Sequence, residues 1–211
     1  MPKFLILKLQ GPMQAWGTHT FEDFRPSNLF PTRSGLLGLL GACLGVDRKD
    51  DEGLERLAAS IEFAVRVDEG GTKLPDFHTV LAARKVDGKA NPNPVVSRRE
   101  YLHGAAFTVA VGSVENAAIP LDAIGDAVRH PLYTPVLGRR SCALARPLFA
   151  GWQEAGDLKA ALDQDPGQGT IYAESEVWGS ERPIELRDVP MRGAHRRFAK
   201  RCVYLLNRGE A

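Results

Sequence analysis

The sequence lacks the features that would place it in several common functional classes. Its three cysteines, Cys43, Cys142 and Cys202, lie far apart and form no Cys-x-x-Cys pair, which argues for reduced thiols in a cytoplasm. The five histidines are equally scattered, so no zinc spacing is visible and we expect neither a metal nor a cofactor. No apolar run reaches the roughly 20 residues that cross a bilayer. We also expect no signal peptide before the strand-like run at Phe4, and no membrane partner.

A net excess of charge is also missing. The 211 residues carry 27 Lys and Arg against 26 Asp and Glu, so no global field draws the protein to nucleic acid. The charges are nevertheless unevenly distributed. Residues 84–103 have five Lys or Arg against two acids, residues 150–190 have nine acids against three Lys or Arg, and residues 192–208 have six Lys or Arg and no acid. This asymmetry suggests one side that binds a polyanion and one acidic side.

The stretch from Phe30 to Gly45 predicts a capped helix with two different faces. Thr32 or Ser34 can supply a side-chain oxygen to the first turn, and Gly45 can end the helix. Leucines fall on one side at helical spacing, whereas glycines fall on the other. Each interior glycine costs roughly 0.8 to 1 kcal/mol, so the stripe predicts the close approach of another element or of a ligand. Arg33 at the positive helix end suits a phosphate, although it could equally be solvated.

The remaining pattern predicts an α+β fold. Strands and helices alternate in the β-α-β-β-α-β order of a ferredoxin-like domain. Asn91-Pro-Asn-Pro94 interrupts the basic segment between the middle strands, which predicts an inserted β-hairpin with a flexible tip. We therefore expect a ferredoxin-like domain over residues 1–149, with a basic hairpin at about 84–103. A smaller, β-rich C-terminal subdomain with a closing strand is expected over residues 150–211.

Aromatic residues accompany the basic clusters. Trp16, Phe21, Phe24 and Tyr101 could stack unpaired bases, which is how single-stranded RNA is usually held. Charge runs are more often solvated faces, and aromatics in loops are more often core plugs, so the residues alone leave RNA binding open. The stacking signature of an RRM is not present. The acidic region is open in the same way, because it could be a docking surface for a protein or a solvated subdomain.

Five segments, taken in order, closely resemble the CasD family of type I-E CRISPR Cascade subunits. The likeness runs from Phe4 to about Phe149 and is weaker through the acidic stretch. It implies a RAMP-superfamily protein in which residues 84–103 form a protruding thumb. The implied function is that of a non-catalytic subunit that binds the 5′ handle of a CRISPR RNA. The segments are Gly11-Pro-Met-Gln-Ala-Trp-Gly17, Phe30-Pro-Thr-Arg-Ser-Gly-Leu-Leu-Gly-Leu-Leu-Gly-Ala-Cys-Leu-Gly45, His78-Thr-Val-Leu81, Arg99-Glu-Tyr-Leu102 and Tyr133-Thr-Pro-Val-Leu-Gly-Arg-Arg-Ser-Cys142.

The resemblance also implies partners and roles for individual residues. The subunit would cap the filament of Cascade backbone subunits beside the large subunit, and would meet target DNA only through the complex. The thumb would lie across the guide where handle meets spacer, while the loop before the glycine-rich helix and the start of that helix would hold handle phosphates and bases. The expected RNA-binding residues are Gln14, Trp16, Arg25, Arg33, Ser34, His78, Arg84, Arg98, Arg99, Arg139, Arg140, Ser141 and Arg197.

The alternative function is that of a metal-independent endoribonuclease that processes precursor CRISPR RNA. Cleavage by 2′-OH attack needs a base, an acid and a cation, for which His, Tyr and Lys serve. A relative in another CRISPR subtype has an adjacent Lys-His pair, but no Lys precedes a His in this chain. Type I-E systems resemble one another in using a separate processing subunit, so we favour binding over catalysis. The candidate catalytic residues would be His78, His103, Tyr101 and His195.

Overall fold

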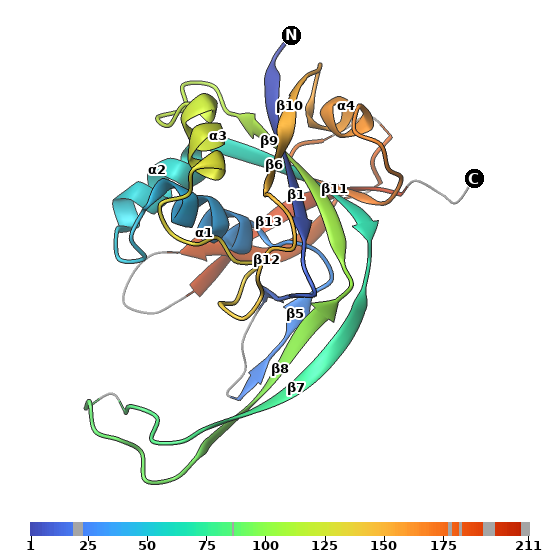
Figure 1. Cartoon of the computed structure of the whole chain (residues 1–211). Helices are drawn as coiled ribbons and strands as arrows, with labels where there is room; N and C mark the ends of the chain where they lie inside the picture. Colours follow the sequence, from blue (N-terminus) through green and yellow to red (C-terminus); the bar gives the residue numbers. More distant parts are fainter. Residues whose placement is uncertain (19–22, 86, 177–178, 182, 192–196, 208–211) are drawn as a thin grey trace.

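The computed structural model describes residues 1–18, 23–85, 87–176, 179–181, 183–191 and 197–207 (Figure 1). A seven-stranded sheet forms the body of the molecule, and every neighbouring pair of its strands is antiparallel. In spatial order its strands are β10 (Phe149–Glu154), β1 (Lys3–Gln10), β9 (Ala106–Ser113), β6 (Ile61–Glu69), β11 (Ile171–Ala173), β13 (Arg197–Leu206) and β12 (Ile184–Met191).

Helices cover both faces of this sheet (Figure 1). The element order β1-α1-β6, then β9-α3-β10, produces the expected β-α-β-β-α-β succession, with the four strands arranged as β10-β1-β9-β6. The α+β class is therefore confirmed. The helices are α1 (Arg33–Leu44), α2 (Asp51–Ser60), α3 (Leu121–Arg129) and α4 (Leu158–Asp163).

Two hydrophobic clusters follow from the alternation of side chains along β1. Leu5, Leu7 and Leu9 point into the main core, which also takes the leucine face of α1 and the apolar residues of α3. Phe4 and Ile6 point the opposite way into a smaller cluster formed with α4. Because successive side chains in a strand face opposite sides, a continuous apolar run is what a strand buried on both faces requires.

Helix α1 has the caps and the two faces that its sequence predicts. The Thr32 Oγ1 atom accepts a hydrogen bond from the Gly35 amide at 3.3 Å, and Gly45 ends the helix with a left-handed φ of 75°. Its small-residue stripe admits protein neighbours. A Cβ atom on Gly35 would lie 2.8 Å from the Trp16 ring, and one on Gly41 would lie 3.1 Å from a methyl group of α2.

The smaller sheet carries the hairpin that projects from the body (Figure 1). Strands β7 (Thr72–Val80) and β8 (Val95–His103) pair along their whole length, so the hairpin begins at Thr72 and is longer than the expected segment 84–103. The other edge of β8 pairs with β2 (Met13–Gln14) and β4 (Phe24–Arg25), while β3 (Trp16–Gly17) pairs with β5 (Ser27–Asn28). The hairpin is therefore held at its root by the loop that precedes α1.

The strands that the structure describes within residues 149–207 all belong to the seven-stranded sheet. Strand β10 joins one edge beside β1, and β11 joins the opposite side beside β6. Much of the acidity of this region is neutralised within the fold. Asp165 forms ion pairs with Arg66 at 2.9 Å and with Lys8 at 2.5 Å. The acidic composition therefore compensates basic side chains of the sheet, which the sequence alone could not show.

Candidate nucleic-acid interface

The root of the hairpin brings together basic residues from four separate segments. Strand β8 lies between β7 and β4, and Arg99 is in register with Asp76 on one side and with Arg25 on the other. Residues directly paired across neighbouring strands share a face of the sheet. His78, two residues beyond Asp76 along β7, shares this face too. We call the face that carries Arg25, Arg99 and His78 the inner face of the hairpin.

Arg139 links the loop before β10 to this inner face. Its guanidinium donates to the Glu100 carbonyl at 3.1 Å and to the Arg25 carbonyl at 3.0 Å. The same group lies 4.7 Å from the centre of the Tyr101 ring, which is within cation–π range. Arg139 therefore positions the root of the hairpin with its nitrogens, while Arg140 beside it is exposed.

His78 lies beside a carboxylate on the inner face. Its Nε2 atom is 2.5 Å from the Asp76 Oδ2 atom and 3.4 Å from the Tyr101 hydroxyl. These contacts engage one ring nitrogen, so Nδ1 is the atom that remains for a ligand. About one third of the His78 side chain is accessible, at 33 %. The ring can therefore hydrogen-bond a nucleic acid, and the Asp76–His78–Tyr101 group also has the residue types of an acid–base pair.

Glu100 fixes the opposite face of β8 to the loop before α1. Its Oε2 atom accepts from the Lys73 ammonium at 2.9 Å and from the Ser27 amide at 3.1 Å. Burial alone would raise the pKa of Glu100, but these donors and the positive charge of Arg139 outweigh it, so the pKa lies below its ordinary value. The root of the hairpin is thus held by charge on both faces of the sheet.

Gln14 and Trp16 are buried, so the structure contradicts our expectation that they contact RNA. Both side chains are 0 % exposed. The Gln14 amide donates to the Ala105 carbonyl at 2.7 Å and to the Leu9 carbonyl at 3.3 Å, and its oxygen accepts from the Trp16 indole at 3.0 Å. Together these two side chains hold the loop before α1 in place from its buried side, because they join β1, the hairpin root and the start of α1.

Arg33 does not offer a free guanidinium at the start of α1, which corrects a second expectation. It forms an ion pair with Glu174 and donates to the Ala58 carbonyl at 2.7 Å. Its backbone amide, which would face an anion at the helix end, donates to Asp188 at 2.7 Å. Neighbouring Ser34 is half-buried, with its hydroxyl 3.4 Å from that of Thr32. Protein carboxylates therefore occupy the place predicted for a phosphate.

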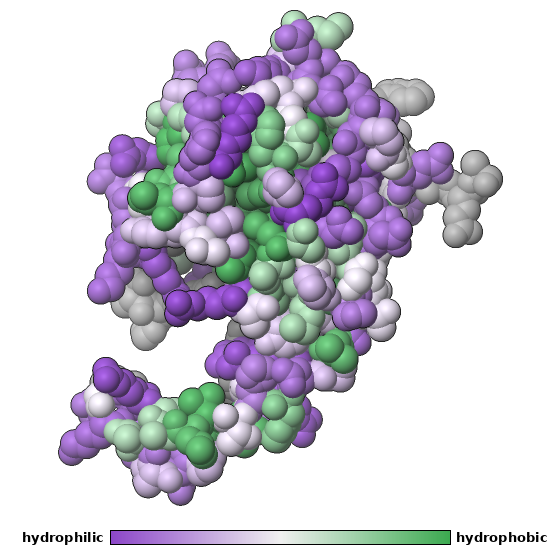
Figure 2. All heavy atoms as spheres, in the orientation of Figure 1, coloured by the Kyte–Doolittle hydropathy of each residue, from purple (hydrophilic) through white to green (hydrophobic). Residues whose placement is uncertain are grey.

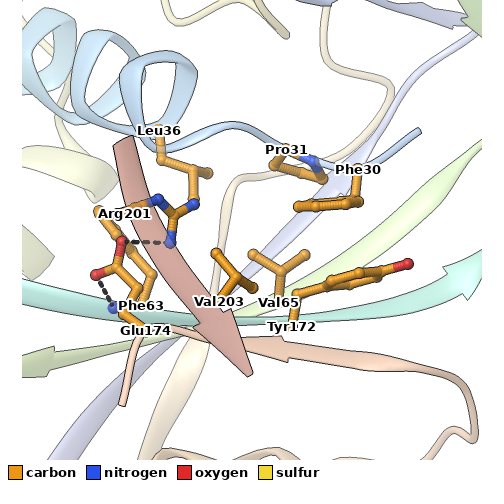
Figure 3. Close-up of a pocket in the computed structure, with 9 residues that line it drawn as sticks. All are labelled: Phe30, Pro31, Leu36, Phe63, Val65, Tyr172, Glu174, Arg201 and Val203. Carbon is orange, nitrogen blue, oxygen red and sulfur yellow. Dashed lines mark hydrogen bonds and ion pairs between the residues drawn. The ribbon is translucent and has the colours of Figure 1, made fainter. Parts of the chain in front are cut away.

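The same ion-pair network lines a small pocket between α1 and the sheet (Figure 3). Glu174 accepts from the Phe63 amide at 2.9 Å and pairs with Arg201 at 3.1 Å, and Arg201 also holds Asp188. Burial disfavours the charged Arg201, but Asp188 and Glu174 outweigh this and raise its pKa. Only about 10 Å³ is free inside the pocket, room for a single water. We interpret it as structural.

The remaining predicted residues are spread over the surface. Arg84 is exposed at the tip of the hairpin, and Arg98 is exposed on the face of β8 opposite Arg99. Ser141 is exposed beside Arg140. Arg197 is exposed at the start of β13, where it pairs with Met191 and not with the hairpin. His195, a candidate for catalysis, lies outside the described residues, as do Arg192 and Arg196 of the last basic cluster.

Sequence reasoning missed the tethering role of Arg139. No local signal in Gly-Arg-Arg separates the two arginines, because the carbonyls that Arg139 binds lie 39 and 114 positions away in the sequence. Over the part of the chain that the structure describes, no group of three or more His, Cys, Asp or Glu could hold a metal ion. The helices within these same ranges include none that is long and apolar enough to cross a membrane.

Comparison with known proteins adds to this geometry. Residues 4–204 match the family described as CRISPR-associated protein (Cas_Cas5). The CRISPR system Cascade subunit CasD of Escherichia coli (strain K12) is 47% identical over 219 residues, covering 99% of this chain and 98% of that protein. A chain of a CRISPR RNA-guided surveillance complex superposes with a TM-score of 0.78 at 30% identity, over 97% of this chain and 89% of that one.

A chain described as a Cas protein is also similar, with a TM-score of 0.68 at 28% identity over 97% of this chain and 94% of the other. The likeness thus spans the sheet, the hairpin and the C-terminal strands and is not confined to one motif. Sequence and structure therefore agree that this chain belongs to the Cas5 family of CRISPR-associated proteins.

Proposed function

We propose that this chain is the CasD-type subunit of a Cascade complex and that it binds the 5′ handle of a CRISPR RNA without cleaving it. The carrying observation is the convergence of Arg25, Arg99, Arg139 and His78 on the root of a projecting hairpin. The family and the near-full-length likeness to CasD support this assignment. So does the strand order β10-β1-β9-β6, which is compatible with a ferredoxin-like RAMP domain that carries a thumb.

The side chains on the inner face divide the work. Arg25 is exposed on this face, and Arg140 is exposed in the loop that carries Arg139. The Arg99 Nε atom is 3.2 Å from the Ser97 hydroxyl, which leaves the outer nitrogens of Arg99 for phosphate oxygens. The guanidinium of Arg139 donates its hydrogen bonds to backbone carbonyls and so orients this face. Phosphate contacts fix the register of a nucleic acid and supply most of its affinity, whereas base contacts supply specificity. His78 is the group on this face that suits a base or a ribose.

The proposed partners follow from the same assignment. The chain would end the filament of backbone subunits beside the large subunit, and would meet target DNA through the assembled complex. The similarity to a chain of a CRISPR RNA-guided surveillance complex supports this placement. In guided effectors the protein binds backbone and fixed segments while base pairing reads the target. A handle of constant sequence is a segment that the protein itself can read.

Binding of repeat RNA tests this proposal directly. Purified full-length chain is titrated with labelled repeat RNA and with a scrambled RNA of equal length, at several fixed salt concentrations. We expect tighter binding of the handle than of the scrambled RNA. We call the slope of the logarithm of the binding constant against the logarithm of the salt concentration the salt slope, and its magnitude should fall by about one for each phosphate contact removed by Arg25→Ala or Arg99→Ala. The matched control is Lys49→Ala, which removes an exposed positive charge from the loop before α2. Equal affinity for both RNAs, with no effect of either arginine, would contradict the proposal.

Endoribonuclease activity remains the second candidate function, because Asp76, His78 and Tyr101 form a titratable group on the same face. The test is the length of the bound RNA on a denaturing gel, with and without Mg²⁺. Intact RNA supports the binding role. A cut at one defined position that disappears in His78→Ala, and in RNA with a 2′-deoxy nucleotide at that position, would replace it with metal-independent cleavage.

A further inference from the structure

The face of the hairpin opposite the inner face, which we call the outer face, carries a row of three side chains that the proposed handle-binding site does not include. Phe24 on β4, Arg98 on β8 and Phe77 on β7 are directly in register across three neighbouring strands. Paired residues share a face, and successive residues alternate between faces, so this row points away from Arg99 and Arg25. With neighbouring strands about 4.8 Å apart, the two phenyl groups stand roughly 10 Å from one another with a guanidinium between them.

The row is open to solvent. Phe77 is 63% exposed and Phe24 is 38% exposed, and Arg98 is exposed as well. Over the described ranges, neither phenyl ring stacks on another aromatic ring, and Arg98 forms no ion pair. Figure 2 shows hydrophobic residues interspersed with hydrophilic ones along this projecting hairpin. Two large aromatic rings exposed on the same face of a narrow hairpin form a surface on which a partner can bind.

The positive charge around the row favours a polyanion as the partner that binds there. Residues 72–103 contain six Lys or Arg and three Asp or Glu. Two of the three acids are already paired, Glu100 with Lys73 on the outer face and Asp76 with His78 on the inner face. An aromatic ring offers a stacking surface to any base, and a guanidinium between two rings can stack on a base or bind the adjoining phosphate.

We infer that Phe24, Arg98 and Phe77 form a stacking platform for unpaired nucleobases of single-stranded nucleic acid. This inference rests on the proposed function, because it assumes that RNA is bound at the root of the hairpin. It adds a second binding face, so that a single strand crosses from the phosphate-binding inner face to the base-stacking outer face around the edge of the hairpin.

The test compares side chains that keep bulk with side chains that keep the aromatic ring. The double variant Phe24→Leu with Phe77→Leu keeps apolar volume and removes both rings, whereas the double variant with Tyr at both positions keeps the rings. Thr79→Ala, an exposed change on the same strand, is the matched control. Each protein is titrated with repeat RNA at fixed salt, and with RNAs in which single nucleotides of the handle lack their base but keep their phosphate.

We expect the Leu variant to bind about tenfold more weakly, while the Tyr variant and Thr79→Ala bind like the original chain. At one or two positions the loss of a base should weaken the original chain by a similar factor and leave the Leu variant unaffected. Undiminished RNA binding by the Leu variant overturns the inference. If the Leu variant binds RNA normally but no longer assembles with purified backbone subunits, the row is a protein-docking surface and the inference is equally wrong.

The two proposals fail in different ways. If the chain does not prefer the handle over the scrambled RNA, the proposed function fails. Scrambled RNAs that lack single bases but keep their phosphates then still show whether the row stacks bases. If the handle is preferred but no abasic position responds to the loss of the rings, handle binding stands and the stacking platform fails.

Discussion

Arg139→Ala separates a residue that positions the hairpin from one that binds phosphate. The change removes two hydrogen bonds from a charged donor to the Glu100 and Arg25 carbonyls, and a cation–π contact with Tyr101. Buried bonds of this kind contribute about 1.5 to 3 kcal/mol each. The bond to Glu100 is half-buried and the bond to Arg25 is exposed, so we discount each bond to about 1 kcal/mol or less. The ring contact adds roughly 0.5 kcal/mol. The root of the hairpin should therefore lose about 2 kcal/mol.

Hydrogen exchange measures this loss where it occurs. The Arg98 amide donates to the Asp23 carbonyl at 2.9 Å, beside the short pairing of β4 with β8. A local loss of about 2 kcal/mol should speed exchange there by roughly 30-fold, while the amides of β1 in the central sheet keep their protection. RNA affinity should fall with little change in salt slope. Arg140→Ala, the adjacent control, should leave hydrogen exchange at the hairpin root unchanged and lower the salt slope. Unchanged exchange with a lower salt slope in Arg139→Ala would refute the reasoning.

Three further predictions concern the support of this face. Gln14→Leu leaves two backbone carbonyls and the Trp16 indole without their partners, so urea unfolding should show a loss of about 2 to 4 kcal/mol and unchanged salt slope in RNA binding. Gly38→Ala should stabilise α1 by about 0.5 to 1 kcal/mol in the same assay, since a Cβ there meets nothing, whereas Gly35→Ala should destabilise it by contact with the Trp16 ring. The folded-state pKa of Glu100 is lowered, so its contribution to stability is present above about pH 4.3 and is lost as the pH falls through the folded pKa. Glu100→Gln should therefore be less stable than the original chain at pH 7, and this difference should shrink as the pH of the unfolding experiment falls below about 4.3.

Local patterns predicted the parts of the fold that local chemistry decides. The caps and the leucine face of α1 depend on residues within a few positions of one another, and they appear as expected. The hairpin was underestimated because its expected start at residue 84 followed the basic residues, whereas β7 has the sequence Thr-Lys-Leu-Pro-Asp-Phe-His-Thr-Val, without the alternation of apolar and polar residues that would show its pairing with β8. A strand that projects from the body buries neither face, so the signal on which strand prediction depends is weak there.

The candidate site was harder to predict because its residue types were right but their partners are distant in sequence. Arg33 and Glu174 are 141 positions apart, and nothing near Arg33 shows that a carboxylate will meet it. Trp16 lies in a segment whose composition fits a plug as well as a surface, and Gly35 of α1 is what makes room for its ring. Arg25 and Arg99, by contrast, become neighbours through strand pairing, which leaves Arg25 exposed and Arg99 half-buried on the same face.

The two-faced hairpin also restricts how such a chain can change in length over evolution. Insertion or deletion of one residue within β8 would move every following side chain to the opposite face, and would exchange the Arg99 surface for the Arg98 surface. The connection between Val80 and Val95 is under no such constraint, because residues added there leave the register intact. Related chains should therefore vary in length at the tip and keep the spacing from Thr72 to Phe77, and from Arg98 to Tyr101, unchanged.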